Sequence, residues 1–135
     1  MIVLAVDFGT RRLGLALGNT SLRTATPLPP LHRGELAHDV DRFHEVKEEY
    51  GVECLLFGRP LNMDGTPGRI MAAAENFANH LRRQLNLPLL WQDERLSSVA
   101  ADELLAPNEP DPFKRKAMRD SVAAMVFLND FLESQ

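Results

Sequence analysis

The chain begins Met1-Ile-Val-Leu-Ala-Val-Asp7-Phe-Gly-Thr-Arg-Arg-Leu-Gly14, and this stretch decides the fold. Residues 2–6 form a continuous apolar run, which is typical of a strand covered on both faces of its sheet. The run ends at Asp7, and a basic turn that contains glycine follows at once. A buried, unpaired carboxylate costs several kcal/mol, so such a group usually binds a metal, pairs with a cation or shifts its pKa. In the simpler alternative, Asp7 only hydrogen-bonds to the backbone of the turn.

The rest of the chain predicts an α/β protein with a mixed sheet and helices on both of its faces. Alternating leucines over 13–17 predict a second strand, paired with the first as an antiparallel hairpin. Three prolines within 24–31 allow at most an edge strand there. Later strands and helices alternate, which predicts parallel pairing in the second half of the chain. The later strands are predicted at 54–57 and 89–92, and the helices at 35–50, from Thr66-Pro67 onward, around 97–105 and at 113–133.

Length and composition predict one soluble domain over residues 1–135. The chain is 44% hydrophobic and 25% charged, as in ordinary globular proteins. It opens without a basic segment followed by a long apolar one, and no apolar run approaches the roughly 18 residues of a membrane span, so we expect no membrane partner. The single cysteine, Cys54, provides no disulfide framework and fits the reducing cytoplasm.

The net charge of −4 argues against binding nucleic acid through bulk charge alone. The distribution of the cations is more informative, because twelve of the fifteen are arginines, and arginine forms bidentate contacts with phosphate. Alternatively, these side chains only solvate the surface. The cations that we select as candidates for nucleic-acid contact are Arg11, Arg12, Arg59, Arg95, Lys114, Arg115 and Lys116.

Acidic residues occupy three comparable positions. Asp7 ends the first strand, Asp93-Glu94 ends the last strand, and Asp120 lies in the final helix on the same apolar stripe as Phe127. Ligand crevices form at strand ends in open α/β sheets. Each acid has a structural alternative, as a helix cap or as the partner of a neighbouring arginine. Convergence of all three on one sheet edge favours a functional site.

Clustered carboxylates repel one another and raise one another's pKa unless a cation lies among them. Mg²⁺ and Mn²⁺ prefer such oxygen ligands. The chemistry that suits this arrangement is phosphodiester hydrolysis with two metal ions, in which nearby arginines hold the flanking phosphates. These residues therefore predict a metal-dependent nuclease.

Four segments together resemble the YqgF family, and the resemblance covers nearly the whole chain in the family's order. It implies an RNase H-like fold similar to that of Holliday junction resolvases, and a role in maturing the 5′ end of pre-16S ribosomal RNA. It also implies that Asp7, Glu94 and Asp120 are the catalytic, metal-binding acids, while Asp93 is left open. The segments are Asp7-Phe-Gly-Thr-Arg-Arg-Leu-Gly14, Gly58-Arg-Pro-Leu-Asn-Met-Asp-Gly65, Asp93-Glu-Arg-Leu-Ser-Ser98 and Asp120-Ser-Val-Ala-Ala124.

Two segments near the acids have alternative interpretations. In the loop 58–65, Asn62 makes a polar contact with the substrate strand, or Gly58, Asn62 and Gly65 only provide the conformation of a strand-to-helix turn. Arg59 stands where the family commonly has leucine, which adds a cation beside the acids. The cluster Lys114-Arg-Lys116 is a phosphate-binding arm or the solvated start of a helix.

The candidate substrates are structured RNA and branched DNA. A nuclease that processes the 5′ end of pre-16S rRNA is the leading hypothesis, and a Holliday junction resolvase is the alternative, which would require a symmetric homodimer with two active sites. A lesser alternative is a non-catalytic RNA-binding assembly factor. The stretch 7–10 also resembles the first phosphate loop of actin-like ATPases and sugar kinases, but those enclose a nucleotide between two lobes, far more chain than 135 residues.

Overall fold

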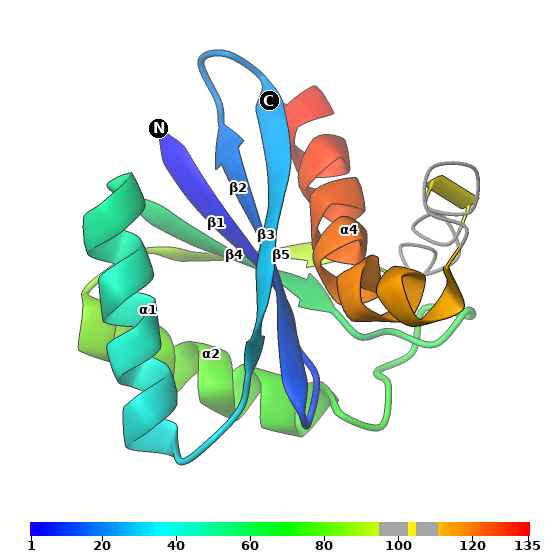
Figure 1. Cartoon of the computed structure of the whole chain (residues 1–135), viewed down its shortest axis with the longest axis horizontal. Coiled ribbons are helices and arrows are strands. Elements are labelled where there is room, and N and C mark those ends of the chain that lie inside the picture. The colour runs from blue at the N-terminus through cyan, green and yellow to red at the C-terminus, as the bar shows by residue number, and fades with distance from the viewer. Residues whose placement is uncertain (95–102, 105–110) are drawn as a thin grey trace.

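A mixed five-stranded sheet organises the part of the chain that the structure describes (Figure 1). The computed structural model describes residues 1–94, 103, 104 and 111–135, with the backbone only over 113–117. The strand order is β3-β2-β1-β4-β5, with antiparallel pairing of β1–β2 and β2–β3 and parallel pairing of β1–β4 and β4–β5. The elements are β1 (Ile2–Asp7), β2 (Arg12–Asn19), β3 (Thr24–His32), α1 (Leu36–Tyr50), β4 (Cys54–Arg59), α2 (Met71–Leu85), β5 (Leu89–Asp93) and α4 (Pro112–Glu133).

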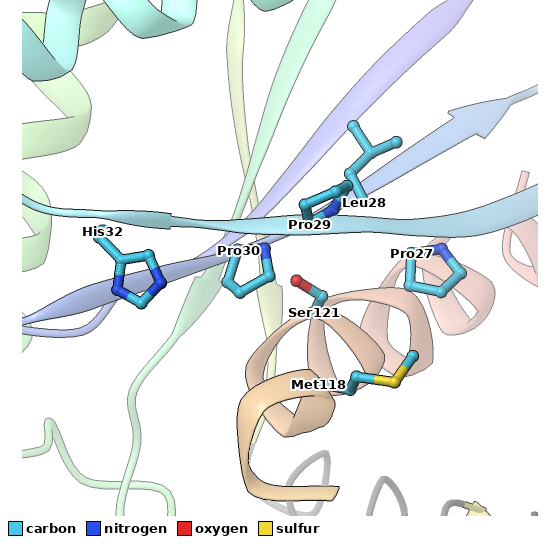
Figure 2. A pocket seen from close by; sticks show the side chains of 7 residues that line it. All are labelled: Pro27, Leu28, Pro29, Pro30, His32, Met118 and Ser121. Atoms are coloured by element: carbon cyan, nitrogen blue, oxygen red, sulfur yellow. The ribbon is translucent and has the colours of Figure 1, made fainter. Parts of the chain in front are cut away.

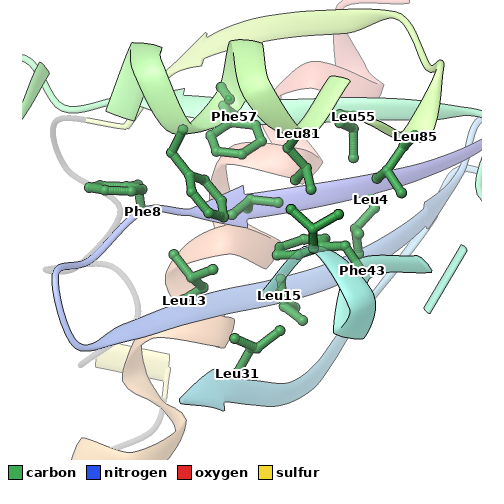
Figure 3. Packing of buried hydrophobic residues seen from close by; sticks show 14 of the residues in the cluster. Leu4, Phe8, Leu13, Leu15, Leu31, Phe43, Leu55, Phe57, Leu81 and Leu85 are labelled. Carbon is green, nitrogen blue, oxygen red and sulfur yellow. The ribbon is translucent and has the colours of Figure 1, made fainter. Parts of the chain in front are cut away.

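Helices cover both faces of the sheet, as the sequence predicted: α1 and α2 lie on one face and α4 lies on the other (Figure 1). Successive residues of a strand point to opposite faces. Leu4 and Val6 of β1 accordingly join the core beneath α1 and α2, while Val3 and Ala5 join the core beneath α4. The first of these cores is rich in leucine and phenylalanine (Figure 3). The continuous apolar run at the N-terminus is therefore explained by burial on both faces.

The two cores differ in the size of the residues that β2 contributes. Its leucines, Leu13 and Leu15, face α1 and α2, whereas Ala16 faces α4. Two glycines continue the small face of β2: a Cβ on Gly14 would overlap the backbone of α4, and a Cβ on Gly18 would press on Leu128. The alternation of leucine with small residues thus lets α4 lie close against the sheet.

Helix α4 runs over Pro112–Glu133, close to the predicted range. Its stripe of Ala124, Phe127 and Phe131 is buried against the sheet, which confirms the inward-facing stripe inferred from the sequence.

Helix α1 ends as predicted at Gly51, whose φ of 68° is the left-handed conformation that glycine adopts without strain. No helix in the described ranges combines the length and the apolar character needed to cross a membrane.

The predicted helix start at Thr66-Pro67 is wrong, because α2 begins only at Met71. Thr66 instead closes a local turn in which its backbone N–H and its hydroxyl both donate to Oδ1 of Asp64. Pro67 forms an isolated antiparallel bridge with Leu61. Proline fixes φ at a value that extended backbone also accepts, so the Thr-Pro pair alone does not distinguish the two conformations. The helix predicted around 97–105 lies outside the described residues, except that residues 103 and 104 are helical.

Candidate active site

Parallel pairing brings two of the predicted acids to one edge of the sheet. Asp7 is the last residue of β1, and Glu94 directly follows β5, with β4 between them. The three strands run in the same direction, so their carboxyl ends meet at this edge. By strand alternation, Asp7 lies on the face of Val3 and Ala5, beneath α4.

Two glycines provide the space in which the acids meet. A Cβ on Gly58 would collide with Oε2 of Glu94 and with the ring of Phe127. Gly14 pairs with Asp7 across the β1–β2 hairpin, and a Cβ there would overlap the backbone carbonyl of Asp120. Gly58 lies within β4, so the expectation that it serves a turn conformation is wrong, and its structural role is to leave room for Glu94.

Asp7 and Glu94 are hydrogen-bonded to each other through their carboxyl groups. Burial, followed by the negative charge of Asp7, raises the pKa of Glu94 to about 10. Burial also raises the pKa of Asp7, to about 6, although the hydrogen bond that Glu94 donates opposes the rise. Both pKa values are raised because two adjacent, poorly solvated carboxylates repel each other when both are ionised, which favours a proton between them in the metal-free protein.

Asp120 approaches the pair but has a partner of its own. Its negative charge contributes to the raised pKa of both Asp7 and Glu94, while its Oδ2 lies 3.2 Å from Nε of Arg12. Both of these side chains are partly exposed. No group of three or more His, Cys, Asp or Glu side chains among the described residues is already arranged to hold a metal ion. In this arrangement, then, Asp120 is held by a cation of the chain itself.

The chemistry of the pair nevertheless fits a divalent cation. Oε2 of Glu94 is buried and has no hydrogen-bond partner within the described part of the chain. A buried polar atom without a partner is rare in native structures and indicates a function or an unseen ligand. The possible metal ligands of this pair are carboxylate oxygens, the ligand type that Mg²⁺ and Mn²⁺ prefer. Release of the shared proton would supply the negative charge that a metal ion requires.

Arg33 was not selected from the sequence, yet it anchors the turn after Asp7. Its Nη1 donates to the carbonyl oxygen of Gly9 at 3.3 Å, and its guanidinium carbon lies 5.0 Å from the ring centroid of Phe8. Its Nε pairs with the fully buried Asp39 at 3.5 Å. A single arginine after an edge strand has no spacing signal that reveals such a partner 24 residues upstream. Only the tertiary structure joins it to the site.

Ser121, also missed from the sequence, fixes α4 beside the acids. It is 2% exposed, and its Oγ accepts a hydrogen bond from the backbone N–H of Leu15. Leu15 follows Gly14, so this bond ties the turn of α4 that carries Asp120 to the small face of β2. A serine within the apolar run of the helix was the available signal.

The predicted nucleic-acid contacts lie in different settings. Arg11 is exposed in the turn between β1 and β2. Arg59 is exposed at the end of β4, where its guanidinium carbon lies 5.9 Å from the ring centroid of Trp91. The side-chain amide of Asn62 donates to Thr66 Oγ1 and to the carbonyl oxygen of Pro67. These two bonds favour the interpretation of Asn62 as a residue that shapes its own loop.

The positions of the other predicted cations are described only in part. Arg95 lies outside the described residues. For Lys114, Arg115 and Lys116 the structure describes the backbone, which forms part of the first turns of α4, but not the side chains. Asp93, left open from the sequence, ends β5, and its negative charge contributes to the raised pKa of Glu94. The part that these residues play in binding stays a prediction.

Comparison with known proteins identifies the family. The family model described as "RuvX: Holliday junction resolvase" matches residues 1–134. The chain belongs to the RuvX family. A Bacillus thuringiensis relative is 37% identical over 139 residues, covering 100% of both chains, and carries the description "Putative pre-16S rRNA nuclease". A Roseiflexus relative with the same description is 35% identical, covering 98% of this chain and 94% of the relative. The resemblance to the YqgF family, and with it membership of a nuclease family, is thus confirmed.

Solved structures confirm the fold of this RuvX family member. Thermus thermophilus RuvC in complex with a Holliday junction has a TM-score of 0.57 at 17% identity, covering 99% of this chain and 94% of that one. The fowlpox virus resolvase with its junction DNA has a TM-score of 0.58 at 10% identity, covering 99% and 98%. At such identities the likeness concerns the fold alone, and it confirms the RNase H-like α/β architecture.

Proposed function

We propose that this chain is a single-domain, divalent-metal-dependent nuclease in which Asp7, Glu94 and Asp120 are the metal-binding acids. The observation that carries the proposal is the partly buried Asp7–Glu94 pair, with a buried, unpartnered oxygen on Glu94, at the carboxyl ends of parallel strands. A structural role would leave that oxygen satisfied, because an unmade buried hydrogen bond costs free energy. Membership of the RuvX family supports the assignment.

Each residue has a stated task in this proposal. Two bound Mg²⁺ or Mn²⁺ ions would supply an activated water and neutralise charge on the scissile phosphate. Asp7 and Glu94 give up their shared proton and present oxygen ligands from a nearly dry position. Arg12 exchanges its partner Asp120, 3.2 Å away, for a substrate phosphate, so that Asp120 becomes available as the third acid. Arg11, exposed in the turn after Asp7, would contact a flanking phosphate, whereas Arg59 lies over Trp91 on the face of α1 and α2 and would reach a phosphate only beyond the sheet edge.

The proposed substrate is the unprocessed 5′ end of pre-16S ribosomal RNA in the cytoplasm. The descriptions of the curated relatives support it, since they cover essentially the whole chain at 35% and 37% identity. A second candidate is a Holliday junction or another branched DNA, which the description of the family model favours. Cleavage of a junction would require a homodimer to present two sites.

A cleavage assay with purified protein tests the function. We offer an RNA carrying a 5′ extension of 16S rRNA, a four-way DNA junction and a flapped DNA duplex, each with Mg²⁺, with Mn²⁺ and with EDTA. We expect metal-dependent cleavage of the RNA that Asp7→Asn abolishes. Asp41→Asn, at an exposed acid of α1, is the matched control and retains activity. Cleavage that survives Asp7→Asn would refute the active-site assignment, and preferential junction cleavage would select the second candidate.

A further inference from the structure

A pocket of about 560 Å³ lies between β3 and α4, outside the acid site (Figure 2). Its described lining is mostly apolar: proline rings of β3, with His32 at one end and Met118 of α4 opposite. The side chain of Leu28 points to the other side of β3, where it packs against the core beneath α1 and α2. The hydroxyl of Ser121 lies on the α4 side and points toward β3 in Figure 2. This volume falls within the ~300–1,000 Å³ that is usual for small-ligand sites. We call it the proline pocket; it is lined by Pro27, Leu28, Pro29, Pro30, His32, Met118 and Ser121.

A β-bulge helps to shape the proline pocket. Along β2, Leu13 and Leu15 are two positions apart, while their partners on β3, Leu31 and Leu28, are three positions apart. The extra residue falls at Pro29-Pro30, where neither residue has an N–H to donate to the ladder. Bulges redirect a strand and are over-represented next to active sites. The pocket therefore arises from a specific departure from regular pairing.

The proline pocket adjoins the acid site through the pairing of His32 with Arg12. His32, at its end, is the cross-strand partner of Arg12 in the β2–β3 ladder, and directly paired residues have Cβ atoms about 5 Å apart. Arg12 in turn contacts Asp120. Ser121 and Met118, on the opposite wall, belong to the same turns of α4 as Asp120. A phosphate held near Arg12 would thus have its neighbouring nucleotide at the mouth of the pocket.

We propose that the proline pocket binds one unpaired nucleobase of the substrate strand, next to the phosphate held at the acid site. This inference rests on the proposed nuclease function and adds to it a preference for unpaired nucleotides beside the cleaved bond. The chemistry suits a base, because imidazole and flat apolar surfaces stack on its faces. A thioether adapts to different shapes. Ser121 accepts one hydrogen bond from Leu15, and a serine hydroxyl that accepts one bond can still donate another to a base edge.

Fluorescent base scanning tests the proposal in the inactive Asp7→Asn protein. A hairpin RNA with an unpaired 5′ extension carries 2-aminopurine at one position at a time. We expect the emission to change on binding at one position of the unpaired extension. His32→Ala and Met118→Ala should remove that change and weaken binding by roughly 5- to 150-fold, the range for loss of one stacked base. His44→Ala and Leu22→Ala, at exposed residues far from the pocket, are the matched controls and should behave like the parent.

Other outcomes overturn the proposal. A signal that the pocket variants leave unchanged, or that the controls lose equally, shows that no base enters the pocket. A change in sedimentation on Met118→Ala instead identifies the pocket as an interface between two copies of the chain. The proposed function is decided separately, by metal-dependent cleavage with the wild-type protein. If the wild-type protein cleaves and the pocket variants bind and cleave equally well, the proposed role of the pocket is refuted and the proposed nuclease function stands.

Discussion

The two faces of the sheet differ in the strand residues that they bury. Beneath α1 and α2 the residues are bulky, and even the buried charges are paired, as between Arg33 and Asp39. Beneath α4 the strands present Gly14, Ala16 and Gly58, and the face ends in carboxyl groups that repel one another. Bulky, satisfied packing contributes stability, whereas crowded like charges cost stability and are typical of active sites. We infer that the first face stabilises the fold, whereas the second face carries groups that lower stability and that the proposed catalysis requires.

The largest expected effect is the loss of activity on the α4 face. Asp7→Asn or Glu94→Gln should lower metal-dependent cleavage by on the order of 10³-fold, because each removes a charge from the reacting site. Neither should unfold the protein, since each removes the cost of holding two carboxyl groups side by side in a poorly solvated site. Denaturant unfolding without metal checks this, and Glu94→Gln should be at least as stable as wild type. A variant that fails to fold would show that these acids stabilise the fold.

Truncation on the opposite face should have the reverse effect. Phe77 is 5% exposed and its ring lies 5.6, 6.0 and 6.2 Å from those of Phe8, Phe43 and Phe57. Phe77→Ala should therefore cost about 3–5 kcal/mol of unfolding free energy through lost contacts and a cavity. Cleavage per folded molecule, measured well below the melting temperature, should remain within a few-fold of wild type. A selective loss of activity would mean that the aromatic core also sets the site geometry.

A single methyl group on the α4 face should lower activity far more than its cost in stability, which arises from its contact with the ring of Phe127. Gly58→Ala places its Cβ against the end of the Glu94 carboxyl group, so Glu94 must move. Cleavage should fall by on the order of 10²-fold, as for a catalytic group displaced by about 1 Å. Gly51→Ala is the control, because its φ of 68° makes alanine strained while its Cβ meets no neighbour. It should lower stability by roughly 1 kcal/mol and leave the rate unchanged.

The stability of the metal-free protein should fall as pH rises. Asp7 and Glu94 have pKa values of about 6 and about 10 in the fold, above their ordinary 3.8 and 4.5. The native state therefore binds more protons than the unfolded state. The contribution of the two carboxyl groups to the free energy of unfolding is complete below about pH 4. This contribution is lost as the pH rises through about 6 and on toward 10. Urea midpoints in EDTA at about pH 5 and about pH 9 measure it. The double variant Asp7→Asn/Glu94→Gln should flatten the dependence, and an unchanged slope would contradict the shared proton.

The smallest expected effect compares cations on the two faces. Arg115→Ala, at the start of α4, should weaken nucleic-acid binding and lower the slope of log K against log salt by about 1. Arg83, exposed in the last turn of α2 on the other face, provides the charge-matched control, and Arg83→Ala should leave the slope unchanged. Equal slopes for the two variants would indicate that Arg115 only solvates its helix.

Much of the fold could be read from local pattern. The apolar run before Asp7, the leucine alternation of β2 and the helical stripe of α4 each reflect the periodicity of one element, and periodicity survives in the sequence. The start of α2 could not be read, because Thr66 and Pro67 suit both a helix start and the turn that they actually form. The choice between a helix start and a turn at these two residues depends on contacts with other residues, and a local sequence pattern does not show those contacts.

The family, the RNase H-like architecture and the three candidate acids can all be inferred from the amino-acid sequence, because they depend on residue types at the ends of strands and on one face of a helix. Only the folded chain shows that Asp7 and Glu94 meet at one edge of the sheet, that Arg12 pairs with Asp120, and that Arg33 reaches back to Gly9. The tertiary structure also opens the proline pocket through a bulge in β3. These features depend on distances between residues far apart in the chain, and such distances exist only once strands and helices have packed.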